Sequence, residues 1–297
     1  MNASASDFNI VKLTDNDVND KFPDIYEDNV VWQHWDKVRS NYEIYLNSIE
    51  VTNNKKDDTM PVIFGSNIAW TGMDQQYPYY RRIYKNGVPI TNPGDIIGNP
   101  VMNSGNVVWS STYDIFLNGT KITNSNNEYN LNPSIYGNNI VWTNRSLAKP
   151  ESGAEIYFNG ANISNNDTAD DHPDIFESNI VWQSWDNANN CWQIYKNGNL
   201  VTSGNNNKVA PKIYGEDIVW MENDGNHWQI VYNGKYLTAG DYDNYSPEIY
   251  GDKIVWMQFD GNDYEIYKAT VTPEPASFLL FGMGGLIIRI LKRRKKV

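Results

Sequence analysis

The sequence predicts an all-β protein, a seven-bladed β-propeller that is closed by an N-terminal strand. Two observations carry this prediction: a regular repeat, and complementary gaps at the two ends of the repeated region. A proline is followed nine residues later by a tryptophan seven times, and successive prolines lie 38, 39, 33, 40, 38 and 36 residues apart. This period suits a four-stranded blade, and the units hold too many β-branched and aromatic residues for a helical solenoid. The pairs are Pro23–Trp32, Pro61–Trp70, Pro100–Trp109, Pro133–Trp142, Pro173–Trp182, Pro211–Trp220 and Pro247–Trp256.

Each unit predicts four short strands, named a to d. The run after the proline, close to Ile-Tyr-Gly-x-x-Ile-Val-Trp, predicts strands a and b with a tight turn between them. A variable loop leads to an Ile-Tyr pair in strand c, and an Asn-Gly turn with positive φ joins c to the short strand d. We interpret the repeated tryptophans as packing between neighbouring blades. The Asn-Gly pairs are Asn86-Gly87, Asn118-Gly119, Asn159-Gly160, Asn197-Gly198 and Asn233-Gly234.

The two ends of the repeated region complement each other. Phe8–Thr14 has the pattern of an isolated d strand, because the first repeated proline follows Thr14 by nine residues, as after other d strands. The last unit has strands a, b and c, at Glu248–Tyr250, Ile254–Gln258 and Tyr264–Lys268, but no Asn-Gly pair and no d strand. Pairing Phe8–Thr14 with this c strand would close the ring and remove an exposed sheet edge. Residues 8–271 are therefore predicted to form one domain.

Residues 272–297 differ in composition from the repeats. Pro273, Glu274 and Pro275 precede 13 apolar or small residues, and the chain ends in a basic cluster that includes Arg293 and Arg294. This order predicts a short transmembrane helix whose basic end stays in the cytoplasm. It also resembles the PEP-CTERM sorting signal of Gram-negative bacteria. The alternative is a plain C-terminal membrane anchor.

The resemblance to a PEP-CTERM signal implies a route for the protein. The chain would be anchored transiently in the inner membrane, processed by an exosortase-type enzyme and delivered to the cell envelope or the extracellular space. Organisms with this system usually make exopolysaccharide. Residues 1–7 lack a charged and an apolar segment but contain Ala3-Ser4-Ala5, a small-x-small pattern that ends signal peptides. Our hypothesis is that they are the remnant of a signal peptide, and the alternative is a disordered N-terminus.

The charge of the repeats narrows the class of partner. Without residues 273–297 the chain has 18 Lys and Arg against 35 Asp and Glu, a net charge of −17. Such a surface argues against nucleic acid as a partner. The single cysteine, Cys191, excludes an internal disulfide.

The b–c and d–a loops vary most between units, and they emerge on one face of the predicted ring. Loops on a rigid scaffold are where binding residues are expected. We predict Trp35, Asp36, Trp185, Asp186 and Trp228 as ligand-binding residues, because an aromatic face beside polar groups suits a sugar ring. The alternative is that the tryptophans pack the long b–c hairpins onto the next blade.

Acidic d–a loops offer candidate calcium ligands. Asp15 and Asp17, and likewise Asp241 and Asp243, place carboxylates at alternate positions, a spacing that can hold calcium. None of these loops has the full twelve-residue pattern with a terminal glutamate, so solvated, turn-forming acids are the alternative. No other cofactor is predicted.

The sequence contains no catalytic motif: no Gly-x-Ser-x-Gly, no His-Glu-x-x-His and no Gly-rich phosphate loop. We therefore do not predict an enzyme. The Ile-Tyr-Gly-x-x-Ile-Val-Trp units resemble TolB-like propellers and prokaryotic surface propellers, which implies the fold. With the tail, they predict an exported, exosortase-sorted scaffold of the cell envelope or extracellular matrix that binds exopolysaccharide, another glycan or an envelope protein. A polysaccharide-active lyase or hydrolase that uses the loop face is the alternative.

Overall fold

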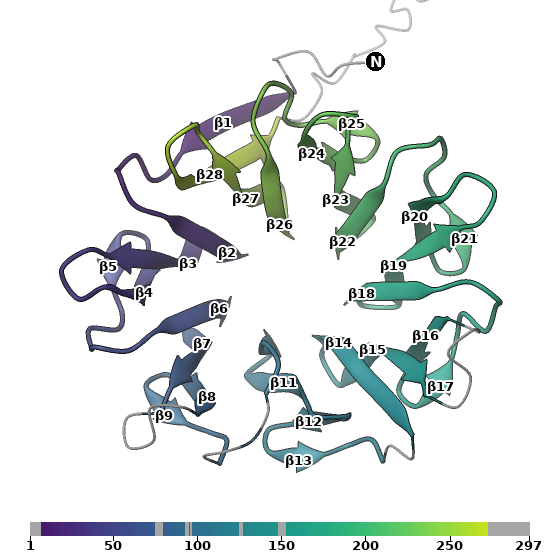
Figure 1. Cartoon of the computed structure of the whole chain (residues 1–297), viewed down its shortest axis with the longest axis horizontal. Helices are drawn as coiled ribbons and strands as arrows, with labels where there is room; N and C mark the ends of the chain where they lie inside the picture. The colour runs from purple at the N-terminus through teal and green to yellow at the C-terminus, as the bar shows by residue number, and fades with distance from the viewer. Residues whose placement is uncertain are drawn as a thin grey trace, which may run out of the picture.

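The protein is described by a computed structural model, which covers residues 7–74, 80–92, 95, 97–124, 127–147 and 153–272. In these residues the chain forms seven four-stranded antiparallel sheets that surround a common axis (Figure 1). Each sheet is one blade. The predicted all-β, seven-bladed propeller is confirmed.

The blades follow one another along the chain, and within blades 1 to 6 the strands run in sequence order from the axis outward. Blade 1 contains β2 (Asp20–Tyr26), β3 (Asn29–Asp36), β4 (Asn41–Leu46) and β5 (Ile49–Glu50). Blade 2 contains β6 (Asp58–Phe64), β7 (Asn67–Met73), β8 (Arg81–Lys85) and β9 (Val88–Pro89). Blade 3 contains β10 (Val101–Asn103), β11 (Asn106–Ser111), β12 (Asp114–Leu117) and β13 (Thr120–Lys121). Blade 4 contains β14 (Glu128–Tyr136), β15 (Asn139–Ser146), β16 (Ala154–Phe158) and β17 (Ala161–Asn162). Blade 5 contains β18 (Asp170–Phe176), β19 (Asn179–Asp186), β20 (Cys191–Lys196) and β21 (Asn199–Leu200). Blade 6 contains β22 (Lys208–Tyr214), β23 (Asp217–Asn223), β24 (Trp228–Tyr232) and β25 (Lys235–Tyr236). Blade 7 contains β26 (Asn244–Tyr250), β27 (Lys253–Phe259), β28 (Tyr264–Val271) and β1 (Phe8–Lys12).

The N-terminal strand β1 is the outermost strand of blade 7, as predicted. It pairs antiparallel with β28 along its whole length. The Leu13 N–H extends this ladder by donating to the Ile266 carbonyl at 2.7 Å. The Phe8 ring meets the Tyr232 ring of blade 6 edge-on, with centroids 5.9 Å apart. Backbone pairing and apolar packing therefore close the ring.

The core lies between the blades. Between blades 1 and 2, for example, Val31 and Ile44 pack against Ile63, Ile68 and Trp70. Each of the seven repeated tryptophans belongs to such a cluster of buried side chains. The interpretation of these residues as packing between blades is confirmed.

The inner strands of six blades carry a β-bulge next to the repeated proline. In these six, the residue before the proline has a φ between 49° and 53°, and the pairing with strand b shifts register there. A bulge twists a strand locally and re-aims the side chains that follow it. In blade 3 the inner strand is short and begins after its proline. The residues with positive φ are Phe22, Met60, Asn132, His172, Ala210 and Ser246.

The predicted C-terminal membrane helix and sorting residues lie outside the described part of the chain. Within that part every regular element is a β-strand. Among the described residues there is also no helix long and apolar enough to cross a membrane. The helical part of the predicted fold is thus not confirmed.

Candidate functional site

A cavity of about 510 Å³ lies at the axis of the ring. Residues of all seven innermost strands line it, and these strands surround the open centre in Figure 1. Alternate residues of a strand face the same side. The residues one and three positions after each repeated proline therefore line the cavity as two successive layers. Its volume falls in the range of ligand pockets.

The layer formed by the residue after each proline is charged. Three carboxylates, those of Asp24, Asp174 and Glu248, share it with the ammonium of Lys212. Lys212 Nζ lies 2.7 Å from Glu248 Oε1. The remaining positions are held by Val62, Val101 and Ser134.

The two aspartates of this layer are fixed by neighbouring inner strands. Asp24 Oδ2 accepts a hydrogen bond from the Ile63 N–H at 2.7 Å, and Asp174 Oδ2 accepts one from the Ile213 N–H at 2.9 Å. The Ser134 hydroxyl donates to Asp174 Oδ1 at 2.6 Å. These bonds link adjacent blades and hold the carboxylates at the cavity wall.

The charges of the layer perturb one another. Burial raises the pKa of Asp24 to about 6, against the hydrogen bonds that it accepts. Burial also raises the pKa of Glu248 to about 8; nearby Lys212 opposes this shift and the charge of Asp24 adds to it. Burial lowers the pKa of Lys212, but the surrounding carboxylates outweigh burial and raise it overall, so the ammonium stays charged.

The layer three residues after each proline is aromatic in six blades. Neighbouring rings contact each other in one continuous arc, with centroids 4.4 to 4.8 Å apart and planes tilted by 47° to 54°. In blade 3 Asn103 takes this place, and its Oδ1 accepts the Gly137 N–H at 2.9 Å. The cavity is therefore bordered by an aromatic ring with one polar gap. The arc runs through Phe64, Tyr26, Tyr250, Tyr214, Phe176 and Tyr136.

The predicted ligand-binding residues lie on three separate blades and do not line this cavity. Trp35 and Asp36 end β3 of blade 1, Trp185 and Asp186 end β19 of blade 5, and Trp228 begins β24 of blade 6. Blades 1 and 5 face each other across the ring (Figure 1). The structure does not bring the five residues into one site.

The two loop tryptophans contact aromatic residues of their own hairpins. The Trp35 ring meets the Tyr42 ring nearly edge-on, with centroids 5.0 Å apart. The Trp185 ring meets the Trp192 ring in the same way at 5.5 Å. Each pair joins the end of a b strand to the start of the c strand that pairs with it.

The aspartates of these hairpins hold turns. Asp36 and Asp186 each accept backbone hydrogen bonds from the residues two and three positions ahead. The Trp228 N–H donates to Asp243 Oδ1 at 2.8 Å, which engages one of the calcium candidates as well. Among the other candidates, Asp17 pairs with Lys37 at 2.7 Å and Asp241 is exposed.

One calcium candidate, Asp15, lies in an acidic group that could hold a cation. Its carboxylate is grouped with those of Asp260 and Glu265, with ligand atoms within 4.8 Å of one another. Lys12 Nζ lies 2.5 Å from Asp15 Oδ1, 3.1 Å from Asp260 Oδ2 and 3.9 Å from Glu265 Oε1. A lysine ammonium thus supplies the positive charge here, and it ties β1 to the last hairpin of blade 7.

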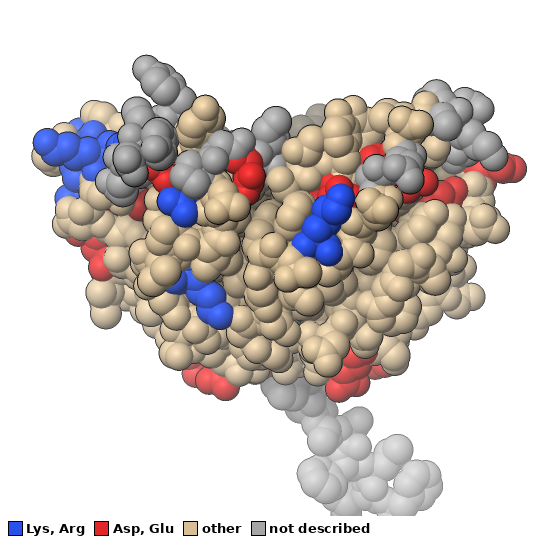
Figure 2. Space-filling view, turned by 90° about the horizontal axis from the view of Figure 1, so that it is seen from below, with Lys and Arg blue, Asp and Glu red and all other residues tan. Residues whose placement is uncertain are grey.

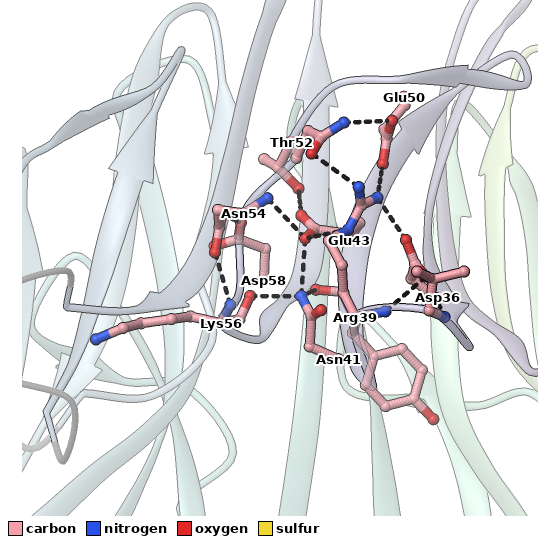
Figure 3. A network of polar contacts seen from close by, with 12 residues as sticks. Asp36, Arg39, Asn41, Glu43, Glu50, Thr52, Asn54, Lys56 and Asp58 are labelled. Carbon is pink, nitrogen blue, oxygen red and sulfur yellow. Dashed lines mark hydrogen bonds and ion pairs between the residues drawn. The ribbon is translucent and has the colours of Figure 1, made fainter.

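A buried polar network, which was not predicted from the sequence, joins one blade to the next. Glu43 accepts hydrogen bonds from Thr52 Oγ1 at 2.6 Å and from the Asn54 N–H at 2.8 Å (Figure 3). The Asn54 side-chain amide donates to Asp58 Oδ2 at 2.6 Å, and Trp70 Nε1 donates to Asp58 Oδ1 at 2.9 Å. The network therefore runs from strand c of blade 1 to strand b of blade 2.

The network recurs around the ring with a spacing that the sequence carries. At the closure, Glu265, Thr14, Asn16, Asp20 and Trp32 make the same set of bonds. Acidic side chains are rarely buried unless they are paired, so the acid twelve residues before the tryptophan was not predicted to lie in the core. The indole donor and acceptor pairs are Trp32–Asp20, Trp70–Asp58, Trp142–Asn130 and Trp256–Asn244.

The three histidines, His34, His172 and His227, lie on blades 1, 5 and 6. Each has an aspartate within 3.7 Å of its Nδ1. In the described part of the chain, no serine, threonine or cysteine side chain is hydrogen-bonded to any of them. The described residues therefore contain no nucleophile paired with a histidine base.

No protein-family model matches the chain, and no curated protein matches it. Solved structures do. The chain is similar to a Mycobacterium tuberculosis puromycin-hydrolyzing peptidase (TM-score 0.61, 11% identity, 81% of this chain and 49% of that one). It is also similar to Pyrococcus horikoshii acylaminoacyl peptidase (0.62, 10%, 84% and 50%). A third is the β-propeller domain of the Trilobed protease from Pyrococcus furiosus (0.60, 13%, 85% and 95%).

These similarities show the fold of the chain and how much of each similar protein it matches. The chain spans about half the length of the two peptidases and nearly all of the separate propeller domain. That domain has an open velcro topology, whereas β1 closes the ring here.

The comparisons correct the predicted function. The prediction of an exported glycan- or protein-binding matrix scaffold is wrong, because the similar solved structures named above are two peptidases and the propeller domain of a protease. The alternative of a polysaccharide lyase or hydrolase fails for the same reason. The predicted loop residues Trp35, Asp36, Trp185 and Asp186 make hairpin contacts, and their role in ligand binding stays a prediction.

Proposed function

We propose that this chain is the non-catalytic propeller of a proteolytic system, and that its axial cavity takes in an extended peptide. One observation carries the proposal: a single cavity of about 510 Å³ is lined by all seven blades. The ring around it is closed by β1, so blades would surround a bound segment all the way around the axis. The similarity to peptidase propellers supports this class of function.

The gap in the aromatic ring provides the test. Asn103→Tyr puts at blade 3 the residue type that other blades carry at this position, so we expect the variant to fold. It would narrow the cavity, and we expect the full-length chain to lose at least about tenfold in affinity for a short unstructured peptide. Fluorescence anisotropy with a labelled peptide measures this.

The matched control is Asn199→Tyr, which makes the same replacement on the exposed outermost strand β21, outside the cavity lining. It should bind like the original chain. Equal affinity of Asn103→Tyr and Asn199→Tyr, with both variants folded by circular dichroism, would show that peptides do not enter the cavity.

We also propose that residues 273–297 direct the propeller out of the cytoplasm through an exosortase-type partner, with transient anchoring in the inner membrane. The order of Pro273-Glu274-Pro275, an apolar segment and a basic end supports this. In a host with an exosortase, the exported protein should lack residues 278–297. Replacing the three residues by alanine should leave a membrane-bound, uncleaved form. Intact-mass measurement decides it, since a released chain that still ends at Val297 would exclude processing.

A further inference from the structure

The wall of the axial cavity holds more negative than positive charge. Above about pH 8, where Glu248 has lost its proton, the layer after the prolines has three negative charges, on Asp24, Asp174 and Glu248, against the one positive charge of Lys212. At neutral pH Glu248 is mostly protonated, and the charges of the two aspartates remain. Lys212 is engaged by Glu248 at 2.7 Å. Both aspartates accept hydrogen bonds from backbone N–H groups, which fix them but bring no full charge. The layer therefore lacks one positive charge for neutrality at neutral pH, and two above about pH 8.

The aromatic ring next to this layer also favours cations. The faces of phenylalanine and tyrosine rings carry negative electrostatic potential and attract ammonium and guanidinium groups. Six such rings stand around the cavity in one arc. A group held between the two layers would meet carboxylates on one side and aromatic rings on the other.

The approach to the ring is acidic as well. Exposed acids follow the aromatic positions in the a–b turns, so they surround the end of the cavity that the arc borders. In the side view of Figure 2, acidic side chains are visible at the lower edge of the molecule as well as in its upper part, and no basic side chain is visible at the lower edge. Charges of one sign around an opening raise the local concentration of ions of the opposite sign. The turn acids are Glu27, Asp28, Glu177, Glu216 and Asp252.

From these three features, and given the proposed function of taking in a peptide, we infer that the cavity selects peptides with a positively charged group. An N-terminal or lysine ammonium, or an arginine guanidinium, would lie between the carboxylate layer and the aromatic ring. Asp24, Asp174 and Glu248 would supply the charge, and the arc of rings would supply the cation-binding faces.

The test compares three short peptides of equal length, with central Lys-Arg, Ser-Ser or Glu-Glu, on the folded full-length chain. We expect the Lys-Arg peptide to bind at least about tenfold more tightly than the Ser-Ser peptide, and the ratio to fall at high salt. Asp24→Asn with Asp174→Asn should remove most of this preference. Asp241→Asn with Asp167→Asn removes the same charge from exposed loops outside the cavity lining and should keep it.

A change of opposite sign separates recognition from mere loss of structure. Lys212→Met removes the resident cation. At pH 7.5 Glu248 is mostly protonated with or without Lys212, so the layer of the variant is more negative and the Lys-Arg peptide should bind more tightly than to the original chain. Weaker or equal binding to this folded variant would overturn the inference.

The outcomes also separate this inference from the proposed function. If all three peptides bind equally, peptide uptake stands and charge selection is wrong. If butylammonium binds but none of the three peptides does, the cation site stands and peptide uptake is wrong. If neither peptide nor amine binds, both are wrong.

Discussion

Trp70 does more than fill space between blades 1 and 2. Its ring is buried in the apolar cluster, and its Nε1 donates to Asp58 at 2.9 Å. Asp58 is itself buried, and burial raises its pKa to about 6. An unpaired acid at this depth would cost stability, so the tryptophan and the acid depend on each other.

Blade 3 offers an internal comparison for this bond. Trp109 has Ile97 twelve residues upstream, a side chain without an acceptor. Trp70→Phe should therefore destabilise the protein by about 1–3 kcal/mol more than Trp109→Phe, because only the former takes the indole donor away from one oxygen of a buried carboxylate. Urea unfolding of the two variants measures the difference. Equal losses would mean that packing alone accounts for the repeated tryptophan.

Blade 6 shows how the same position tolerates a change of charge. Lys208 stands twelve residues before Trp220, and the indole instead donates to Glu222 at 3.4 Å. Lys208 Nζ lies 3.7 Å from the same glutamate. The acceptor has moved to the neighbouring strand b, which keeps the indole paired.

At the scale of the element, β1 carries the closure of the ring. It covers the edge of β28, and the segment after it supplies both partners of the buried Glu265: the Thr14 hydroxyl at 2.5 Å and the Asn16 N–H at 2.6 Å. Lys12 adds contacts to the acids of the last hairpin. Loss of this segment would expose a sheet edge and strand a buried carboxylate at once.

We predict that deleting residues 1–14 lowers the melting temperature by about 10 °C or more, since a loss of at least about 3 kcal/mol is expected. Deleting residues 1–6 is the matched control and should change it little. Thermal denaturation followed by circular dichroism compares the two. A full-length melting temperature for the longer deletion would contradict closure by β1.

At the scale of the whole molecule, buried acids should make stability depend on pH in an unusual direction. Burial raises the pKa of Asp58 and of Asp24 to about 6 and that of Glu248 to about 8. For His34, burial lowers the pKa, but the bond to Asp20 outweighs it, so the pKa is raised. Each of these groups holds a proton in the folded chain at a pH where the unfolded chain has released it.

The sign follows from proton linkage. Because the folded chain binds more protons between about pH 5 and pH 7.5, stability should fall as the pH rises through this window. Asp58 alone corresponds to a change on the order of 2 kcal/mol. Urea midpoints should therefore be higher at about pH 5 than at about pH 7.5, and Asp58→Asn should flatten the dependence. Greater stability at the higher pH would contradict the assignment of these carboxylates as buried.

Local chemistry in the chain was enough to predict the architecture. Pro-to-Trp spacing, Asn-Gly turns and β-branched strands act over a few residues, and they defined seven blades and the closing strand Phe8–Thr14 correctly. The axial site could not be predicted in this way. Asp24, Asp174, Lys212 and Glu248 lie 36 to 224 residues apart in the sequence. They share one layer because ring closure places equivalent positions of different repeats around one axis.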